Sequence, residues 1–241
     1  MIKNKKMPLF SILKSAGLYC LSNLRLTLIF VFIFYAVGVG ALWSWQTWAF
    51  WPLMVLLYVV WAVFFRVYFN RRPFLSWKLL FNSLLPSTKI VILTVLIATV
   101  LVVLPIVPLF INISPEFNQN YARFLQGDIE HNGMLILVAN VLFLLVSPYI
   151  AYRPFLAWIS ALLGRSGSIR QAWNKTQGNY FEFLIISIWT DCMLSVARWI
   201  ILELGGNDYI TMAVAAPLMV YFNVVSAMAY EFFFLDKVEE K

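Results

Sequence analysis

Charged residues are scarce in this chain of 241 residues. Only 12% of the residues are Asp, Glu, Lys or Arg, whereas 62% are hydrophobic and the mean hydropathy is +0.82. Soluble domains carry roughly 25% charged residues, so this composition excludes a water-soluble globular protein. An aromatic content of 17% excludes a disordered chain. The composition therefore predicts a polytopic membrane protein.

Cysteine and histidine are also rare. The two cysteines, Cys20 and Cys192, are too few for a disulfide-stapled secreted domain. His131 is the single histidine, which rules out a two-histidine zinc site and a Ser-His catalytic arrangement. No Gly-rich phosphate loop follows a strand pattern. We therefore expect a protein that is not an enzyme and that uses neither a metal nor another cofactor.

Long apolar runs are abundant instead. A helix that crosses a bilayer needs about 20 apolar residues. The runs are continuously apolar rather than alternating, which indicates helices and not barrel strands. The sequence thus predicts an all-α membrane protein with one polytopic domain over residues 1–241. The six predicted spans are Leu26–Trp43, Ala49–Phe69, Ile90–Asn112, Met134–Tyr152, Phe181–Leu204 and Tyr209–Phe234.

The positive charges predict the orientation of these spans. When the loops are assigned alternately to the two sides, every lysine and arginine except Arg123 and Arg198 falls on one side. Cytoplasmic loops carry this excess, so we expect both termini to be cytoplasmic. The net charge of +7 then reflects topology and contact with anionic lipid, without a nucleic-acid partner.

The cytoplasmic segments have the periodicity of amphipathic helices. In residues 1–25 one stripe of the predicted helix is apolar, with Phe10, Leu13, Leu21 and Leu24. The opposite side carries Ser11, Lys14, Ser15, Ser22 and Arg25. Such a helix lies on a membrane surface. The second segment, Pro73–Leu85, is predicted to lie at headgroup depth. Alternatively, these helices only return the chain into the bilayer.

One short motif occurs twice. Arg72-Pro73-Phe74-Leu75-Ser76-Trp77 recurs as Arg153-Pro154-Phe155-Leu156-Ala157-Trp158, and each copy directly follows an even-numbered span. A fainter third copy, Pro8–Ile12, precedes the first span. The pattern indicates three units, each made of a cytoplasmic segment followed by a two-helix hairpin.

The third cytoplasmic segment breaks at residues 164–167. Ser168 and Gln171 then have the spacing of a capping box, which predicts a short second helix that stops near Gly178-Asn179. Free amide groups at a helix start flanked by guanidinium groups suit a phosphate. The candidate residues for an anionic lipid headgroup are Arg165, Ser168, Arg170 and Lys175. The positive-inside rule explains the same charges without a specific site.

The sequence from Ser168 to Phe181, SIRQAWNKTQGNYF, resembles a cytoplasmic segment of YciC-like proteins and of the related membrane domain of some glycerophosphodiester phosphodiesterases. In those families a serine, basic residues, a tryptophan and a T-x-G-N step lead into the penultimate hairpin. The resemblance covers about the second half of the chain, Gly133–Phe234. It implies a six-span protein of the bacterial inner membrane and carries over no catalytic residue. A soluble phosphodiesterase domain is absent from this sequence.

Polar residues within predicted spans are costly and are therefore functional candidates. Asp191 lies near the middle of the fifth span, with Arg198 on the same face, and Asn223 and Asn140 lie in the sixth and fourth spans. They indicate either a polar pathway for a proton or small solute, or hydrogen bonds that only hold helices together.

Two functions follow as hypotheses. The first is a non-enzymatic membrane scaffold or envelope factor that contacts lipids, including anionic headgroups, or other membrane proteins. The alternative is a small-solute or proton-coupled transporter that uses the polar groups in spans four to six.

Overall fold

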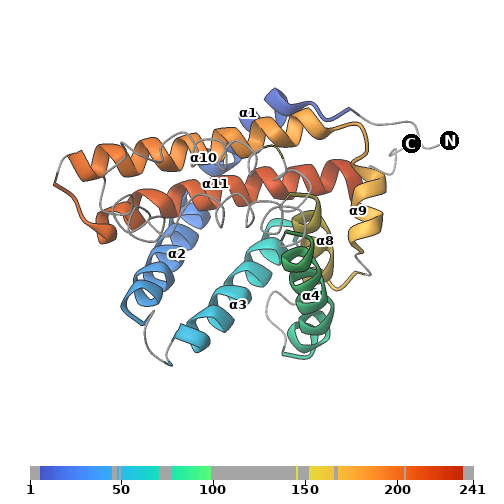
Figure 1. Cartoon of the computed structure of the whole chain (residues 1–241), viewed down its shortest axis with the longest axis horizontal. Coiled ribbons are helices and arrows are strands. Elements are labelled where there is room, and N and C mark those ends of the chain that lie inside the picture. Colours follow the sequence, from blue (N-terminus) through green and yellow to red (C-terminus); the bar gives the residue numbers. More distant parts are fainter. Residues whose placement is uncertain are drawn as a thin grey trace, which may run out of the picture.

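The computed structural model of the chain describes residues 6–44, 48, 50–70, 77–98, 145, 152–165, 168–203 and 205–235. These residues form helices and no strand (Figure 1), which confirms the predicted all-α class. The helices are α1 (Leu9–Ser22), α2 (Leu24–Ser44), α3 (Phe50–Tyr68), α4 (Trp77–Ala98), α8 (Arg153–Leu162), α9 (Ile169–Lys175), α10 (Tyr180–Glu203) and α11 (Asp208–Phe234).

Four of these helices are long and apolar enough to cross a membrane. The apolar windows lie in α2, α3, α10 and α11 and cover Leu24–Ala41, Trp51–Tyr68, Tyr180–Ala197 and Tyr209–Phe234. They agree with the first, second, fifth and sixth predicted spans. Most of the third and fourth predicted spans, Ile90–Asn112 and Met134–Tyr152, lies outside the described residues.

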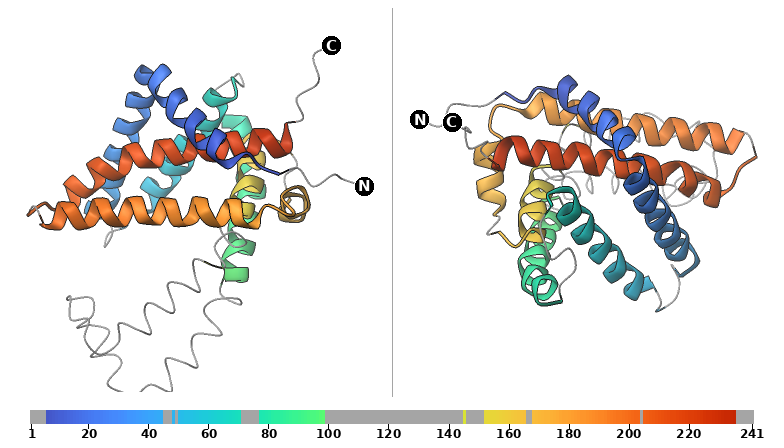
Figure 2. Two further views of the ribbon diagram at one scale, coloured as in Figure 1. Left: turned by 90° about the horizontal axis from the view of Figure 1, so that it is seen from above. Right: turned by 180° about the vertical axis from the view of Figure 1, so that it is seen from behind.

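The longest helices determine the shape of the described part. α10 and α11 lie side by side along the long axis, and α2, α3 and α4 extend from them on one side (Figure 1). α1 crosses α11 (Figure 2). The indole Nε1 of Trp43 donates to the hydroxyl of Tyr209 at 2.7 Å. The end of α2 therefore meets the start of α11, and the predicted topology places both on the outer face.

Aromatic side chains at helical spacing hold α2 and α3 together. The rings of Phe30 and Phe64 meet edge to face with centroids 4.9 Å apart. Phe34 and Phe65 are also buried, so each helix turns one apolar face inward. Val220, Val224 and Tyr230 of α11 join the same core; all three are buried.

The outward faces of these helices are apolar as well. Phe32 of α2 is 69% exposed, Val55 of α3 is 63% exposed and Phe181 of α10 is 68% exposed. Soluble monomers rarely carry large continuous apolar surfaces. A helix that is hydrophobic all round belongs in a core or in lipid, so these faces agree with the predicted membrane class.

The second cytoplasmic segment continues into the third predicted span. α4 runs without a break from Trp77 to Ala98 and contains Pro86, and the headgroup depth of Pro73–Leu85 stays a prediction. Proline inside a helix removes a backbone hydrogen bond, and neighbouring helices can compensate. Here the Tyr58 hydroxyl of α3 lies 2.9 Å from Ser83 Oγ and 3.5 Å from Ser87 Oγ. These contacts hold the turns on both sides of Pro86.

The third segment begins with a helix that is buried within the protein, and its position at the membrane surface stays a prediction. α8 starts with the second copy of the repeated motif, and all its residues except Phe155 are buried. α4, α3 and α11 all pack against it, and its small residues Ala157, Ser160 and Ala161 are buried. Of the first copy, only Trp77 lies within the described residues, so the three-unit repeat stays a prediction.

Candidate functional site

The break between α8 and α9 forms as predicted. α8 ends at Leu162, and Gly164 follows with a φ of 74°, a left-handed conformation that favours glycine. Ser168 caps α9, because its Oγ accepts a hydrogen bond from the Gln171 amide at 3.1 Å. The capping interaction expected from the Ser168-Gln171 spacing is therefore present on the serine side.

The four candidate residues for anionic lipid do not all gather at this break. Arg165, Ser168 and Arg170 are exposed around it. Lys175 lies at the other end of α9, and its ammonium group sits 5.0 Å from the centroid of the Phe234 ring. Lys175 thus makes a cation–π contact with α11. Lipid binding by these residues stays a prediction.

The Thr176–Asn179 turn, which carries the T-x-G-N step, buries its first and last residues and exposes Gln177 and Gly178. Thr176 and Asn179 are both fully buried. Asn179 Oδ1 accepts from the Met7 amide at 2.7 Å, and Asn179 Nδ2 donates to the carbonyl of Gln177 at 3.3 Å. Gly178 permits the turn with a φ of 83°. One amide side chain therefore joins the start of the described chain to the α9–α10 turn.

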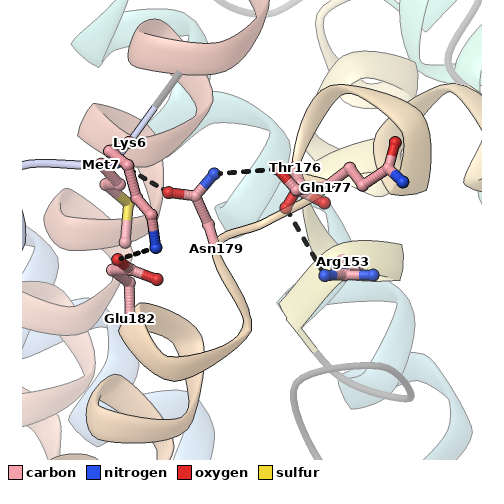
Figure 3. Close-up of polar contacts among 7 residues, drawn as sticks. All are labelled: Lys6, Met7, Arg153, Thr176, Gln177, Asn179 and Glu182. Carbon is pink, nitrogen blue, oxygen red and sulfur yellow. Dashed lines mark hydrogen bonds and ion pairs between the residues drawn. The ribbon is translucent and has the colours of Figure 1, made fainter. Parts of the chain in front are cut away.

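Two charged contacts flank this amide. Lys6 Nζ lies 3.4 Å from Glu182 Oε1 in an ion pair, and Arg153 Nη2 donates to the Thr176 carbonyl at 3.5 Å. Figure 3 shows how Asn179 lies between these contacts. We call this group the polar cluster; it consists of Lys6, Met7, Arg153, Thr176, Gln177, Asn179 and Glu182.

Two buried arginines donate to carbonyls at the C-terminal ends of the short helices α8 and α9, and sequence reasoning missed both contacts. Arg66 and Arg153 are only 2% and 7% exposed. Arg66 Nε and Nη2 donate to the carbonyl of Leu162, the last residue of α8, at 3.2 and 3.1 Å. Arg153 reaches Thr176, which follows α9. Cations are favourable at helix C-termini, but in the sequence both looked like ordinary cytoplasmic charges.

The predicted intramembrane residues are only partly visible. Asp191 and Arg198 both lie on α10, where the structure describes their backbone but not their side chains. Asn140 lies outside the described residues altogether. Asn223 on α11 is buried, with 6% exposure. A polar pathway through these four residues stays a prediction.

Other polar groups pair within the bundle. The hydroxyls of Tyr152 and Thr190 lie 3.0 Å apart, and Ser187 donates to the Phe183 carbonyl at 3.0 Å. Among the described residues, no group of three or more His, Cys, Asp or Glu side chains could hold a metal ion. An apolar pocket lies between α3, α4 and α8. The Tyr152–Thr190 contact joins the residue before α8 to α10, whereas the Ser187 contact lies within α10.

Helix α1 has a face that packs on α11. Its buried residues are Leu9, Ile12 and Ala16. The Tyr221 hydroxyl of α11 donates to the Leu13 carbonyl at 3.2 Å. Near the end of α1, burial raises the pKa of the Cys20 thiol, against a smaller lowering by the Thr27 hydrogen bond. Burial also raises the pKa of Tyr19.

The rest of α1 divides into two further faces. Phe10 and Leu21, members of the predicted apolar stripe, are 81% and 71% exposed. The polar residues of α1 are exposed on the remaining side, where Leu18 is the apolar exception; they are Ser11, Lys14, Ser15 and Ser22. α1 thus has a protein-facing sector, an exposed apolar sector and a polar sector.

The described fold and its polar contacts define a class, an all-helical protein with four apolar helices of membrane-crossing length. No family model matches the sequence, and neither curated proteins nor solved structures give a match.

Proposed function

We propose that this chain is a non-enzymatic integral protein of the bacterial inner membrane, with both termini in the cytoplasm. In this proposal it acts as a scaffold that contacts lipids or other membrane proteins, and α1 is its lipid-contacting element. The observation that carries the proposal is the exposed apolar sector of α1, formed by Phe10 and Leu21.

The division of α1 into three sectors supports a position at the membrane surface. Residues of a helix follow one another at about 100°, so Phe10 and Leu21 fall between the buried face of Leu9 and the polar side of Lys14. The apolar surface therefore continues beyond the part that α11 covers. An interfacial helix buries such a sector among acyl chains and keeps lysine and serine at headgroup level.

The polar contacts in the bundle favour a scaffold over a transport pathway. Tyr58 with Ser83 and Tyr152 with Thr190 are bonded to each other between helices. Contacts of this kind contribute about 0.6–2 kcal/mol to helix association in membranes. Transport remains the second hypothesis, with Asp191, Arg198, Asn223 and Asn140 as its residues. An Asp191→Asn variant that keeps its abundance but loses a measurable flux would support transport instead.

Fluorescence quenching in nanodiscs tests the role of α1. In a Cys20→Ser/Cys192→Ser background, a fluorophore is attached at Phe10→Cys or Leu21→Cys, and at Ser11→Cys or Ser15→Cys as matched positions on the polar side. Lipids that carry a quencher just below the headgroup should quench the first pair several-fold more than the second. Equal quenching at all four positions would show that α1 does not lie on the bilayer.

A further inference from the structure

The residues that precede α1 are fastened to the start of α10. We call Lys6, Met7 and Pro8 the N-terminal strap. The Met7 amide donates to Asn179 Oδ1 at 2.7 Å across 172 positions of sequence, and Lys6 Nζ lies 3.4 Å from Glu182 Oε1 (Figure 3). The Met7 side chain is buried. Because α1 begins directly after the strap, these contacts also fix where α1 starts.

The two residues that hold the strap occupy the capping positions of α10. Asn179 directly precedes α10, and Glu182 lies in the first turn of this helix. Asparagine is a favoured N-cap, because its side-chain oxygen accepts hydrogen bonds from amides of the first turn. A glutamate three residues later can reach back to the N-cap amide and complete a capping box. The sequence at this end of α10 is therefore that of a helix that caps itself.

The start of α11 shows such a cap in this protein. Asn207 directly precedes α11, and its Oδ1 accepts from the amides of Tyr209 and Ile210 at 3.1 and 3.2 Å. At α10 the matching oxygen, Asn179 Oδ1, accepts from Met7 and, within the described residues, from no amide of the first turn. The N-terminal strap therefore takes the acceptor that would otherwise cap α10.

The docked strap leaves part of this capping box unsatisfied. Glu182 Oε2 is buried and has no hydrogen-bond partner among the described residues. A buried carboxylate oxygen without a donor is unfavourable. Departure of the strap would return Asn179 Oδ1 to the amides of α10 and free Glu182 from Lys6. The cap gained by α10 would partly offset the loss of the Met7 contact.

We propose that Asn179 and Glu182 form a two-position latch, which either holds the N-terminal strap, as in this structure, or caps α10 after the strap has left. The two arrangements compete because Asn179 Oδ1 serves a different donor in each. Docking of the strap is therefore linked to the order of the first turn of α10. This coupling goes beyond the proposed function, because it does not depend on the contact of α1 with lipid.

Hydrogen exchange of the full chain in nanodiscs, read at single amides, tests the latch. Met7→Pro removes the amide donor, and proline fits the extended backbone that Pro8 imposes on the residue before it. The amides of Phe181 and Glu182 should then exchange about fivefold more slowly, because Asn179 caps them. Adding Asn179→Ala should abolish this gain. Unchanged or faster exchange in Met7→Pro would overturn the proposal, because a strap that only supports the turn would loosen it on leaving.

The matched control for Met7→Pro is Met7→Ala, which removes the same buried side chain but keeps the amide donor. Exchange at Phe181 and Glu182 should slow less in Met7→Ala than in Met7→Pro. An equal effect in the two variants would assign the change to lost packing and overturn the role of the Met7 amide.

A charge reversal tests the latch at a position where folding is not at risk. Lys6 is 70% exposed, and Lys6→Glu places a second carboxylate beside Glu182, which should favour departure of the strap. Exchange should become about twofold faster at Met7 and about twofold slower at Phe181. Lys14→Glu makes the same change at an exposed lysine of α1 and should alter neither rate. Faster exchange at Met7 without slower exchange at Phe181 would show that the strap leaves without a cap forming on α10, and would overturn the proposal.

Discussion

Arg66 on α3 donates two hydrogen bonds to the carbonyl of Leu162 and thereby closes the C-terminus of α8. The backbone bonds at this end go to the carbonyls of Ile159, Ser160 and Ala161. Among the described residues, the carbonyl of Leu162, a fully buried residue, accepts only from the guanidinium group. One long helix thus supplies the cap of a short one 96 residues later in the chain.

Replacing this arginine should destabilise the bundle. In Arg66→Met the buried carbonyl of Leu162 loses its donor, and an unsatisfied buried polar group costs about 1–3 kcal/mol. Arg25→Met makes the same change at an exposed arginine and should cost less than about 0.5 kcal/mol. Unfolding in detergent, followed by circular dichroism, compares the two. Equal stabilities would mean that the Arg66–Leu162 contact contributes nothing.

Asn179 should hold the N-terminal segment in place. Its side chain is fully buried and bonds both Met7 and Gln177, so Asn179→Ala removes two hydrogen bonds and frees the Met7 amide. Hydrogen exchange at Met7 should then become at least about tenfold faster, which corresponds to a loss of about 1.4 kcal/mol in local stability.

The matched control for Asn179 is Asn174→Ala, because Asn174 is an exposed amide on α9. Exchange at Met7 should stay unchanged in this variant. The Lys6–Glu182 ion pair is expected to contribute little, since Lys6 is 70% exposed and exposed ion pairs add about 0–1 kcal/mol. Fast exchange in both asparagine variants would contradict the role given to Asn179.

Local patterns predicted the long helices well. α2, α3, α10 and α11 are continuous apolar runs long enough to cross a bilayer, so composition alone marks them. The Ser168 cap depends only on residues three positions apart. These features need no knowledge of the tertiary contacts.

Features that depend on distant partners were not predictable in the same way. The buried position of α8 depends on cover from α3, α4 and α11, whereas its sequence reads as an amphipathic interfacial helix. Met7 and Asn179 meet across 172 positions of sequence. The T-x-G-N step is a local sequence pattern, whereas the role of Asn179 follows from its contact with the N-terminal segment.

Two glycines should respond oppositely to alanine. At Gly206 a Cβ atom would lie 2.8 Å from the Ile201 carbonyl oxygen, which accepts the Gly206 amide at the end of α10. Gly206→Ala should therefore destabilise the α10–α11 turn by about 1–3 kcal/mol. At Gly17, within α1, a Cβ atom would meet nothing within 4 Å. Gly17→Ala should stabilise α1 by up to about 1 kcal/mol. Thermal unfolding of both variants checks the signs, and a stabilised Gly206→Ala would contradict the turn geometry.

The thiol of Cys20 should titrate above the usual range of a cysteine. Burial raises its pKa and outweighs the hydrogen bond from Thr27, so less thiolate forms at pH 8 and alkylation slows. Cys20 is measured in a Cys192→Ser background, and the matched control is Ser11→Cys in a Cys20→Ser/Cys192→Ser background. Ser11 is exposed on the same helix. Cys20 should therefore react with a small maleimide several-fold more slowly than the control cysteine. The pH at which the alkylation rate is half-maximal should be higher for Cys20 than for Ser11→Cys. Coincident midpoints would show that the end of α1 is open to water and does not pack as the structure describes.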